Sequence, residues 1–151
     1  MRYLLTSLFL FGLSITFGQS KYNRILNSID DNKTNYSGIA QQIWSYAEMG
    51  YQETQSSALL QKTLEEAGFK ITTGVADIPT AFTATYGSGG PVIAVLGEFD
   101  ALPGLSQKAV PYKVSNDGKA GHACGHHLFG TASAAAAIAI KNYLVGENKP
   151  G

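Results

Sequence analysis

The stretch His126-His-Leu-Phe-Gly-Thr-Ala-Ser-Ala-Ala-Ala-Ala-Ile-Ala-Ile-Lys-Asn-Tyr143 decides the fold, because it predicts one long helix with little polar surface. It is rich in alanine, and Asp, Glu, Lys and Arg are absent from it until Lys141. Small side chains let such a helix pack closely against a sheet, so we expect it to lie at the centre of a domain.

A second apolar run precedes this helix. Val92 to Leu96 has no polar residue, which is typical of a strand buried on both faces. The run ends at Gly97-Glu-Phe-Asp100, and a polar segment from Gln107 to Gly121 predicts a surface loop that leads to the helix. A strand, a loop and a helix in this order indicate the α/β class.

The residues further upstream add helices and strands. Apolar residues at helical spacing predict helices, and alternating patterns predict strands. We expect helices over residues 21–31, 36–49 and 54–67, with Ser37 capping the second and Gly68 ending the third, and strands over residues 69–75 and 81–86. The whole pattern of helices and strands agrees with the α/β class.

The first residues predict a secretory signal peptide rather than part of the fold. Arg2 is followed by an apolar run from Leu4 to Phe17, and Gly18 offers a small residue for cleavage before Gln19. An uncleaved anchor is the alternative, but the run is shorter than the ~20 residues that span a bilayer. We therefore expect a signal peptide over residues 1–18, a folded portion over residues 19–151, and a periplasmic or extracellular location.

The composition excludes some classes of partner. The 151 residues carry 11 basic and 11 acidic side chains, so the formal net charge is zero. Nucleic-acid binding needs a basic surface, and membrane-surface binding needs clustered Lys and Arg. The sequence therefore predicts no nucleic-acid partner and, after removal of the signal peptide, no membrane partner.

The histidines and the single cysteine fall together in Gly121-His-Ala-Cys-Gly-His-His-Leu-Phe-Gly130. Thiolate and imidazole bind a borderline-soft divalent metal well, and a helix start favours the thiolate. Paired C-x-x-C or H-x-x-x-H elements of structural zinc sites are absent, so a catalytic metal site with Cys124 and His126 as ligands fits better. A buried free cysteine beside helix-capping histidines and a thiolate–imidazole catalytic pair are the alternatives.

Two carboxylates follow the predicted buried strand. Glu98 and Asp100 are two residues apart and so point to the same side of the chain. The carboxyl end of a strand is where open α/β sheets place their ligands, and acids there can bind a metal or orient a ligating imidazole. Ordinary loop acids are the alternative. We interpret Glu53, near a helix start, as structural.

Three ordered motifs resemble those of the metal-dependent amidohydrolases of peptidase family M-twenty, which include aminoacylases and auxin-conjugate hydrolases. They are Trp44-Ser-Tyr-Ala-Glu-Met-Gly-Tyr-Gln-Glu53, Gly97-Glu-Phe-Asp-Ala-Leu-Pro103 and the segment from Gly121 to Gly130. The aminobenzoyl-glutamate hydrolase branch is the most similar, and His127, which is Asp in the auxin-conjugate branch, favours it.

The resemblance implies that residues 19–151 are the N-terminal part of a zinc-peptidase-like catalytic domain, C-terminally truncated, with a mixed central α/β sheet flanked by helices. It also implies a site with two zinc or manganese ions. Cys124 and His126 match metal ligands, and Asp100 matches the catalytic acid that orients the site. Glu98 stands where many relatives have a metal-binding His. The family's catalytic glutamate and remaining ligands would lie beyond this chain, so we expect the isolated fragment to be inactive.

The function implied by the resemblance is metal-dependent hydrolysis of the amide bond in a small N-acyl amino acid or aminobenzoyl-glutamate. The resemblance also implies a homo-oligomer formed through the missing inserted domain. Two other functions remain open from the residues alone. One is a non-catalytic metal-binding or interaction module, and the other is a cysteine hydrolase that uses Cys124.

Overall fold

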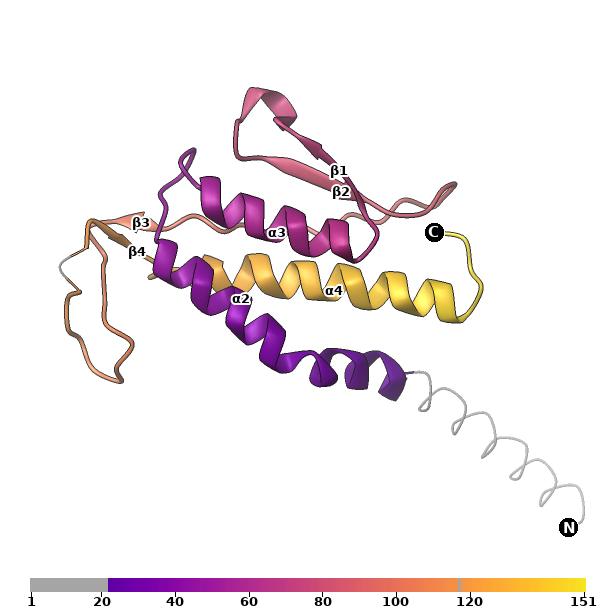
Figure 1. The fold of residues 1–151 in the computed structure, drawn as a ribbon, viewed down its shortest axis with the longest axis horizontal. Helices are drawn as coiled ribbons and strands as arrows, with labels where there is room; N and C mark the ends of the chain where they lie inside the picture. The colour runs from indigo at the N-terminus through magenta and orange to yellow at the C-terminus, as the bar shows by residue number, and fades with distance from the viewer. Residues whose placement is uncertain (1–21, 117) are drawn as a thin grey trace, which may run out of the picture.

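The computed structural model of the chain describes residues 22–116 and 118–151 (Figure 1). The predicted signal peptide, residues 1–18, lies outside the described residues. In chain order the elements are α2 (Lys33–Tyr46), α3 (Thr54–Glu66), β1 (Lys70–Thr73), the 3-10 helix η1 (Val75–Asp77), β2 (Phe82–Thr85), β3 (Leu102–Pro103), β4 (Ala120–Gly121) and α4 (His126–Gly146). The predicted α/β class is confirmed.

The alanine-rich helix α4 lies at the centre of the molecule, as predicted. It packs against α2 and α3, and Figure 1 shows the three helices side by side. The buried apolar side chains at this junction are Ile39, Ile43, Leu60, Leu64, Phe69 and Ala134. By length and mean hydropathy α4 resembles a membrane-spanning helix, but these packing contacts are those of a core helix.

The ends of α3 follow the sequence prediction. The helix begins at Thr54, and Gly68 follows its end with a φ of 91°, a left-handed conformation that favours glycine. The Gly68 N–H donates to the carbonyl of Glu65 at 2.8 Å, and the Phe69 N–H donates to that of Leu64 at 3.0 Å. Gly68 therefore ends α3 in the way its position predicts.

The prediction for α2 was wrong at both ends. Residues 22–31 are helical, as predicted, but α2 begins at Lys33 rather than at Tyr36. Its N-cap residue is Asn32 rather than Ser37, and the Asn32 side chain makes no capping hydrogen bond. It ends at Tyr46 because Ala47 adopts a left-handed conformation with φ 47° and ψ 46°. Periodicity of apolar residues gave the middle of this helix, but a residue other than glycine in a left-handed turn leaves no signal in the pattern.

The strands form two small antiparallel sheets. β1 pairs with β2 in the register Lys70↔Thr85 to Thr73↔Phe82, and β3 pairs with β4 at Leu102↔Gly121 and Pro103↔Ala120. The loop between β3 and β4 (residues 104–119) is closed by hydrogen bonds from the Gly104 N–H to the Lys119 carbonyl at 2.7 Å and from the Lys108 N–H to the Val114 carbonyl at 2.9 Å.

The prediction of a buried strand from Val92 to Leu96 was wrong for the described structure. Val92 is 88% and Leu96 71% exposed, and the run joins no described sheet. A strand forms where neighbouring strands supply backbone hydrogen bonds, and the pairs among the described strands are β1 with β2 and β3 with β4. The described residues therefore form two small sheets and not the mixed central sheet that the family resemblance implies.

Candidate metal centre

Glu98, Asp100 and His126 form a cluster of ligand atoms that lie within 4.8 Å of one another. The His126 ring stands between the two carboxylates. Its Nδ1 is 2.7 Å from Asp100 Oδ1, and its Nε2 is 3.1 Å from Glu98 Oε2. The side chains are 48%, 30% and 19% exposed for Glu98, Asp100 and His126 respectively, so the cluster is open to solvent on one side.

His126 owes its position to a turn that requires glycine. It is the first residue of α4, and the preceding Gly125 has φ 79° and ψ 19°. This left-handed conformation is costly for residues with a Cβ atom. The carbonyl of Gly125 accepts hydrogen bonds from the N–H groups of Leu128 at 2.9 Å and Phe129 at 3.1 Å. Gly125 thus turns the chain so that the helix starts with its imidazole at the cluster.

Glu98 and Asp100 are held by two contacts with neighbouring elements. Glu98 lies directly over Gly130 of α4, where an added Cβ atom would meet the Glu98 carbonyl oxygen at 2.9 Å. On the other side of Asp100, the Ala101 N–H donates to the Glu48 carbonyl at 2.7 Å, and Ala101 forms a parallel bridge with Met49. The two carboxylates are therefore fixed between α4 and the segment that follows α2.

The side chain of Glu48 secures that segment to α3. Its two carboxylate oxygens accept hydrogen bonds from the N–H groups of Gln55 at 2.9 Å and Ser56 at 2.8 Å and from the Ser56 hydroxyl at 2.8 Å. Burial raises the pKa of Glu48, but these hydrogen bonds lower it by more, and the pKa lies below its usual value. Glu48 therefore caps the start of α3 as a carboxylate.

The donor set of the cluster fits a divalent cation. An ionised Asp100 can only accept a hydrogen bond, so His126 Nδ1 donates to it, and a cation between His126 Nε2 and Glu98 would take the lone pair of Nε2. Histidines that bind metals commonly donate their other ring N–H to a carboxylate in this way. Imidazole nitrogen and carboxylate oxygen suit zinc, and carboxylates also suit manganese.

The sequence-predicted site residues meet only in part. The structure brings Asp100 and His126 into contact, and it places the carboxylate of Glu98 beside the other nitrogen of His126. Cys124 is exposed and free, and its sulfur does not belong to the group of closely spaced donors. A metal-binding role for Cys124 therefore stays a prediction.

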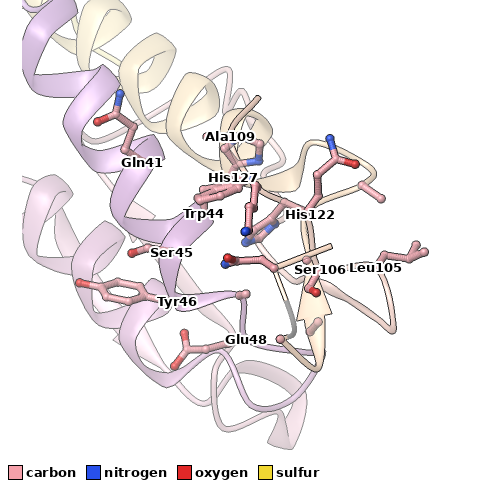
Figure 2. Close-up of a pocket in the computed structure, with 18 of the residues that line it drawn as sticks. Gln41, Trp44, Ser45, Tyr46, Glu48, Leu105, Ser106, Ala109, His122 and His127 are labelled. Atoms are coloured by element: carbon pink, nitrogen blue, oxygen red, sulfur yellow. The ribbon is translucent and has the colours of Figure 1, made fainter. Parts of the chain in front are cut away.

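His122 and His127 are not members of this cluster, and they line a cavity of about 1580 Å³ (Figure 2). The cavity lies between the end of α2 and the 104–119 loop, and Trp44 and Glu48 also line it. The His122 Nε2 atom is 3.0 Å from the carbonyl oxygen of Ile43. Burial lowers the pKa of His122, although the Ile43 carbonyl and Asp100 oppose that shift, and burial together with the neighbouring His122 lowers the pKa of His127.

Sequence reasoning missed this second pair of histidines. His122 and His127 are separated by four residues. Zinc-binding histidines are commonly separated by three to five residues, so a separation of four fits. The only histidine pair considered in the sequence was the H-x-x-x-H element, which has a separation of three. The spacing was the signal that could have drawn attention to the pair.

The comparisons with known proteins agree with the motifs. The chain is 48% identical over 129 residues to one subunit of the p-aminobenzoyl-glutamate hydrolase of Escherichia coli, a match that covers 83% of this chain and 27% of that protein. It is 33% identical over 110 residues to N-acetyl-L-cysteine deacetylase of Bacillus subtilis, covering 69% of this chain and 25% of that protein. It is 29% identical over 140 residues to human Xaa-Arg dipeptidase, covering 84% and 29%.

These matches share one feature: the chain spans about a quarter of the length of each curated relative. No protein-family model matches the chain. The relatives are hydrolases whose names describe acylated or peptide-linked amino acids, in agreement with the family that the three motifs resemble. Motifs and matches together show that this chain belongs to the amidohydrolases of peptidase family M-twenty.

Proposed function

We propose that the complete protein is a metal-dependent hydrolase that cleaves the amide bond of N-acylated amino acids, with aminobenzoyl-glutamate as the substrate. The observation that carries the proposal is the Glu98–Asp100–His126 cluster, in which an oriented imidazole meets two carboxylates. The 48% identity to the p-aminobenzoyl-glutamate hydrolase subunit of Escherichia coli supports the choice of substrate.

Each residue of the cluster has a separate role in this proposal. His126 Nε2 and Glu98 Oε2 would hold a divalent cation, and Asp100 would keep the His126 ring in the orientation and tautomer that ligation needs. When bound, such a cation lowers the pKa of a water ligand to about 7 and polarises the carbonyl of the scissile amide. Asp100 holds the proton of His126 at Nδ1 and so keeps Nε2 available.

We further propose the finer properties that the family resemblance implies. The complete site would use two zinc or manganese ions, with Cys124 as an additional ligand. The 151 residues alone would be inactive, because they span about a quarter of the length of the relatives. The complete protein would be exported, with residues 1–18 removed as a signal peptide, and would form a homo-oligomer.

The test is a hydrolysis assay on the complete protein. Release of glutamate from aminobenzoyl-glutamate is expected, a chelator should abolish it, and added Zn²⁺ or Mn²⁺ should restore it. His126→Ala and Cys124→Ala should each abolish turnover in a folded protein. Glu66→Gln is the matched control, because Glu66 is an exposed carboxylate that pairs with Lys62 on the same helix.

Two outcomes would contradict the proposal. Thiol alkylation that stops turnover, with no effect of a chelator, would identify a cysteine hydrolase instead. Stoichiometric metal binding without hydrolysis of any N-acyl amino acid would identify a non-catalytic metal-binding module.

A further inference from the structure

Two histidine nitrogens outside the Glu98–Asp100–His126 cluster are buried without a hydrogen-bond partner. Within residues 22–116 and 118–151, the unpaired buried side-chain atoms are Nδ1 of His122 and Nδ1 of His127. Only 9% of the His122 surface is exposed. Buried polar atoms almost always have a partner, so unpaired nitrogens on two neighbouring rings call for a ligand, an ion or a water.

The hydrogen bond to Ile43 determines which nitrogen of the neutral His122 ring carries the proton. Nε2 lies 3.0 Å from the Ile43 carbonyl oxygen, and a carbonyl can only accept. Nε2 is therefore the donor, and Nδ1 carries a lone pair. A histidine whose N–H is held by a backbone carbonyl, with the other nitrogen free, has the arrangement typical of a metal ligand.

The His127 ring lies close enough to the His122 ring to supply a second ligand. The ring centroids of His122 and His127 are 5.0 Å apart, and the ring planes are inclined by 51°. Two imidazoles that bind one Zn²⁺ at ~2.0–2.1 Å with a tetrahedral angle have centroids about 5 Å apart. The separation of four residues between the two histidines also fits the spacing of zinc-binding pairs.

We propose that His122 and His127 bind a divalent transition-metal cation of the zinc class through their Nδ1 atoms. Both rings form part of the wall of the 1580 Å³ cavity, and Figure 2 shows them side by side there. The cavity leaves room for water or another ligand to complete the coordination. The site uses other donor atoms than the cluster at His126, because both nitrogens of His126 face carboxylates. It does not depend on the proposed amidohydrolase activity.

The experiment is a Co²⁺ titration of the complete, metal-free protein. Bound Co²⁺ is counted by equilibrium dialysis with elemental analysis, and its visible absorption reports the ligands. His127→Gln should lose one molar equivalent of bound Co²⁺ together with the absorption that belongs to it. His126→Gln, the matched control at the same helix start, should keep that equivalent and lose the one that belongs to the cluster.

A second variant separates binding from folding. His122→Gln should lose the same equivalent as His127→Gln, and circular dichroism should report a folded protein for both. His127→Gln leaves the hydrogen bond between His122 and Ile43 intact. If His122→Gln does not fold, the result for His127→Gln alone therefore decides whether the metal site exists. An unchanged number of bound Co²⁺ ions and an unchanged affinity in His127→Gln would overturn the site. A loss confined to His126→Gln would also overturn it, and would support the cluster alone.

Discussion

At the scale of single residues, Asp100 determines how the ring of His126 is held. Its Oδ1 atom lies 2.7 Å from Nδ1, and no other described side chain makes a hydrogen bond to that nitrogen. We predict that Asp100→Ala lowers the affinity of the complete protein for Zn²⁺ by about 10–100-fold, because loss of an orienting carboxylate typically has an effect of this size. Competition with a chromophoric chelator measures that affinity.

Two further variants complete this test: Asp100→Asn and, as a control at a remote aspartate, Asp30→Asn. Asparagine keeps an oxygen that can accept from Nδ1 but loses the charge, so an intermediate affinity is expected. Asp30→Asn changes an exposed aspartate far from the cluster in the sequence and should leave the affinity unchanged. Equal affinities for Asp100→Ala and the unsubstituted protein would contradict the positioning role of Asp100.

The sequence could identify residues of the cluster from their neighbours in the chain, but not the contacts that they make with distant residues. Asp100 was found because it follows an apolar run, and His126 because it lies in a cluster of histidines and cysteine. The sequence did not reveal that Glu98 would face Nε2 of His126 at 3.1 Å, because that contact depends on how residues 98–100 cross α4. The pairing of His122 with His127 depends in the same way on the position of Ile43, 79 residues away.

At the scale of elements, Glu48 joins the end of α2 to the start of α3. Its contribution to the free energy of unfolding should depend on pH. Its folded-state pKa is lowered, so the stability that it contributes is present above the usual value of 4.5 and is lost as the pH falls through the lowered pKa. We predict that Glu48→Gln destabilises the protein near neutral pH and that the difference disappears in acid. Urea unfolding at a series of pH values measures this.

Glu66→Gln is the control for Glu48. Glu66 lies 3.8 Å from Lys62 on the exposed side of α3, and exposed pairs of this kind contribute little. Its unfolding free energy should therefore follow that of the unsubstituted protein at each pH. A Glu48→Gln variant that behaves in the same way would show that the cap on α3 is dispensable.

Gly130 of α4 allows the segment with Glu98 to approach the helix. A Cβ atom at this position would meet the Glu98 carbonyl oxygen at 2.9 Å and the Phe99 Cβ at 3.1 Å. We predict that Gly130→Ala destabilises the protein by about 1–3 kcal/mol, since the crowding must displace backbone. It should also weaken metal binding by displacing Glu98. Thermal unfolding and Zn²⁺ affinity measure the two effects.

Gly38 of α2 offers a matched control for Gly130. It is also a helical glycine, but no atom lies within 4 Å of the position that an added Cβ atom would take. Gly38→Ala should therefore stabilise the protein by about 0.5–1 kcal/mol, the usual gain in helix propensity. If both substitutions stabilise the protein, the close approach at Gly130 does not constrain the fold.

Helices were more predictable than strands in this chain because their signals are local. The apolar periodicity of α3 and α4 and the glycine after α3 lie within the helices or next to them. The run from Val92 to Leu96 has the composition of a buried strand, but a strand forms only where neighbouring strands supply hydrogen bonds. Such partners are not a property of the run itself.

At the scale of the whole molecule, this apolar run leaves a hydrophobic surface uncovered. Val92, Ile93 and Leu96 are each more than two-thirds exposed. We predict that the 151-residue chain by itself aggregates and that Ile93→Lys reduces aggregation without unfolding it, because exposed apolar segments promote association. Light scattering and circular dichroism measure the two properties. Ile43→Lys, at a fully buried position, should instead unfold the chain.

The 104–119 loop offers a practical means of observing the molecule. Its base is closed by the hydrogen bonds of Gly104 and Lys108, while Tyr112 at its tip is 64% exposed. Ala109 and Val110, close to that tip, line the same cavity as His122 and His127. A fluorescent dye attached through Tyr112→Cys, with Cys124 protected, would therefore report when the cavity is occupied, without labelling any histidine or carboxylate discussed above.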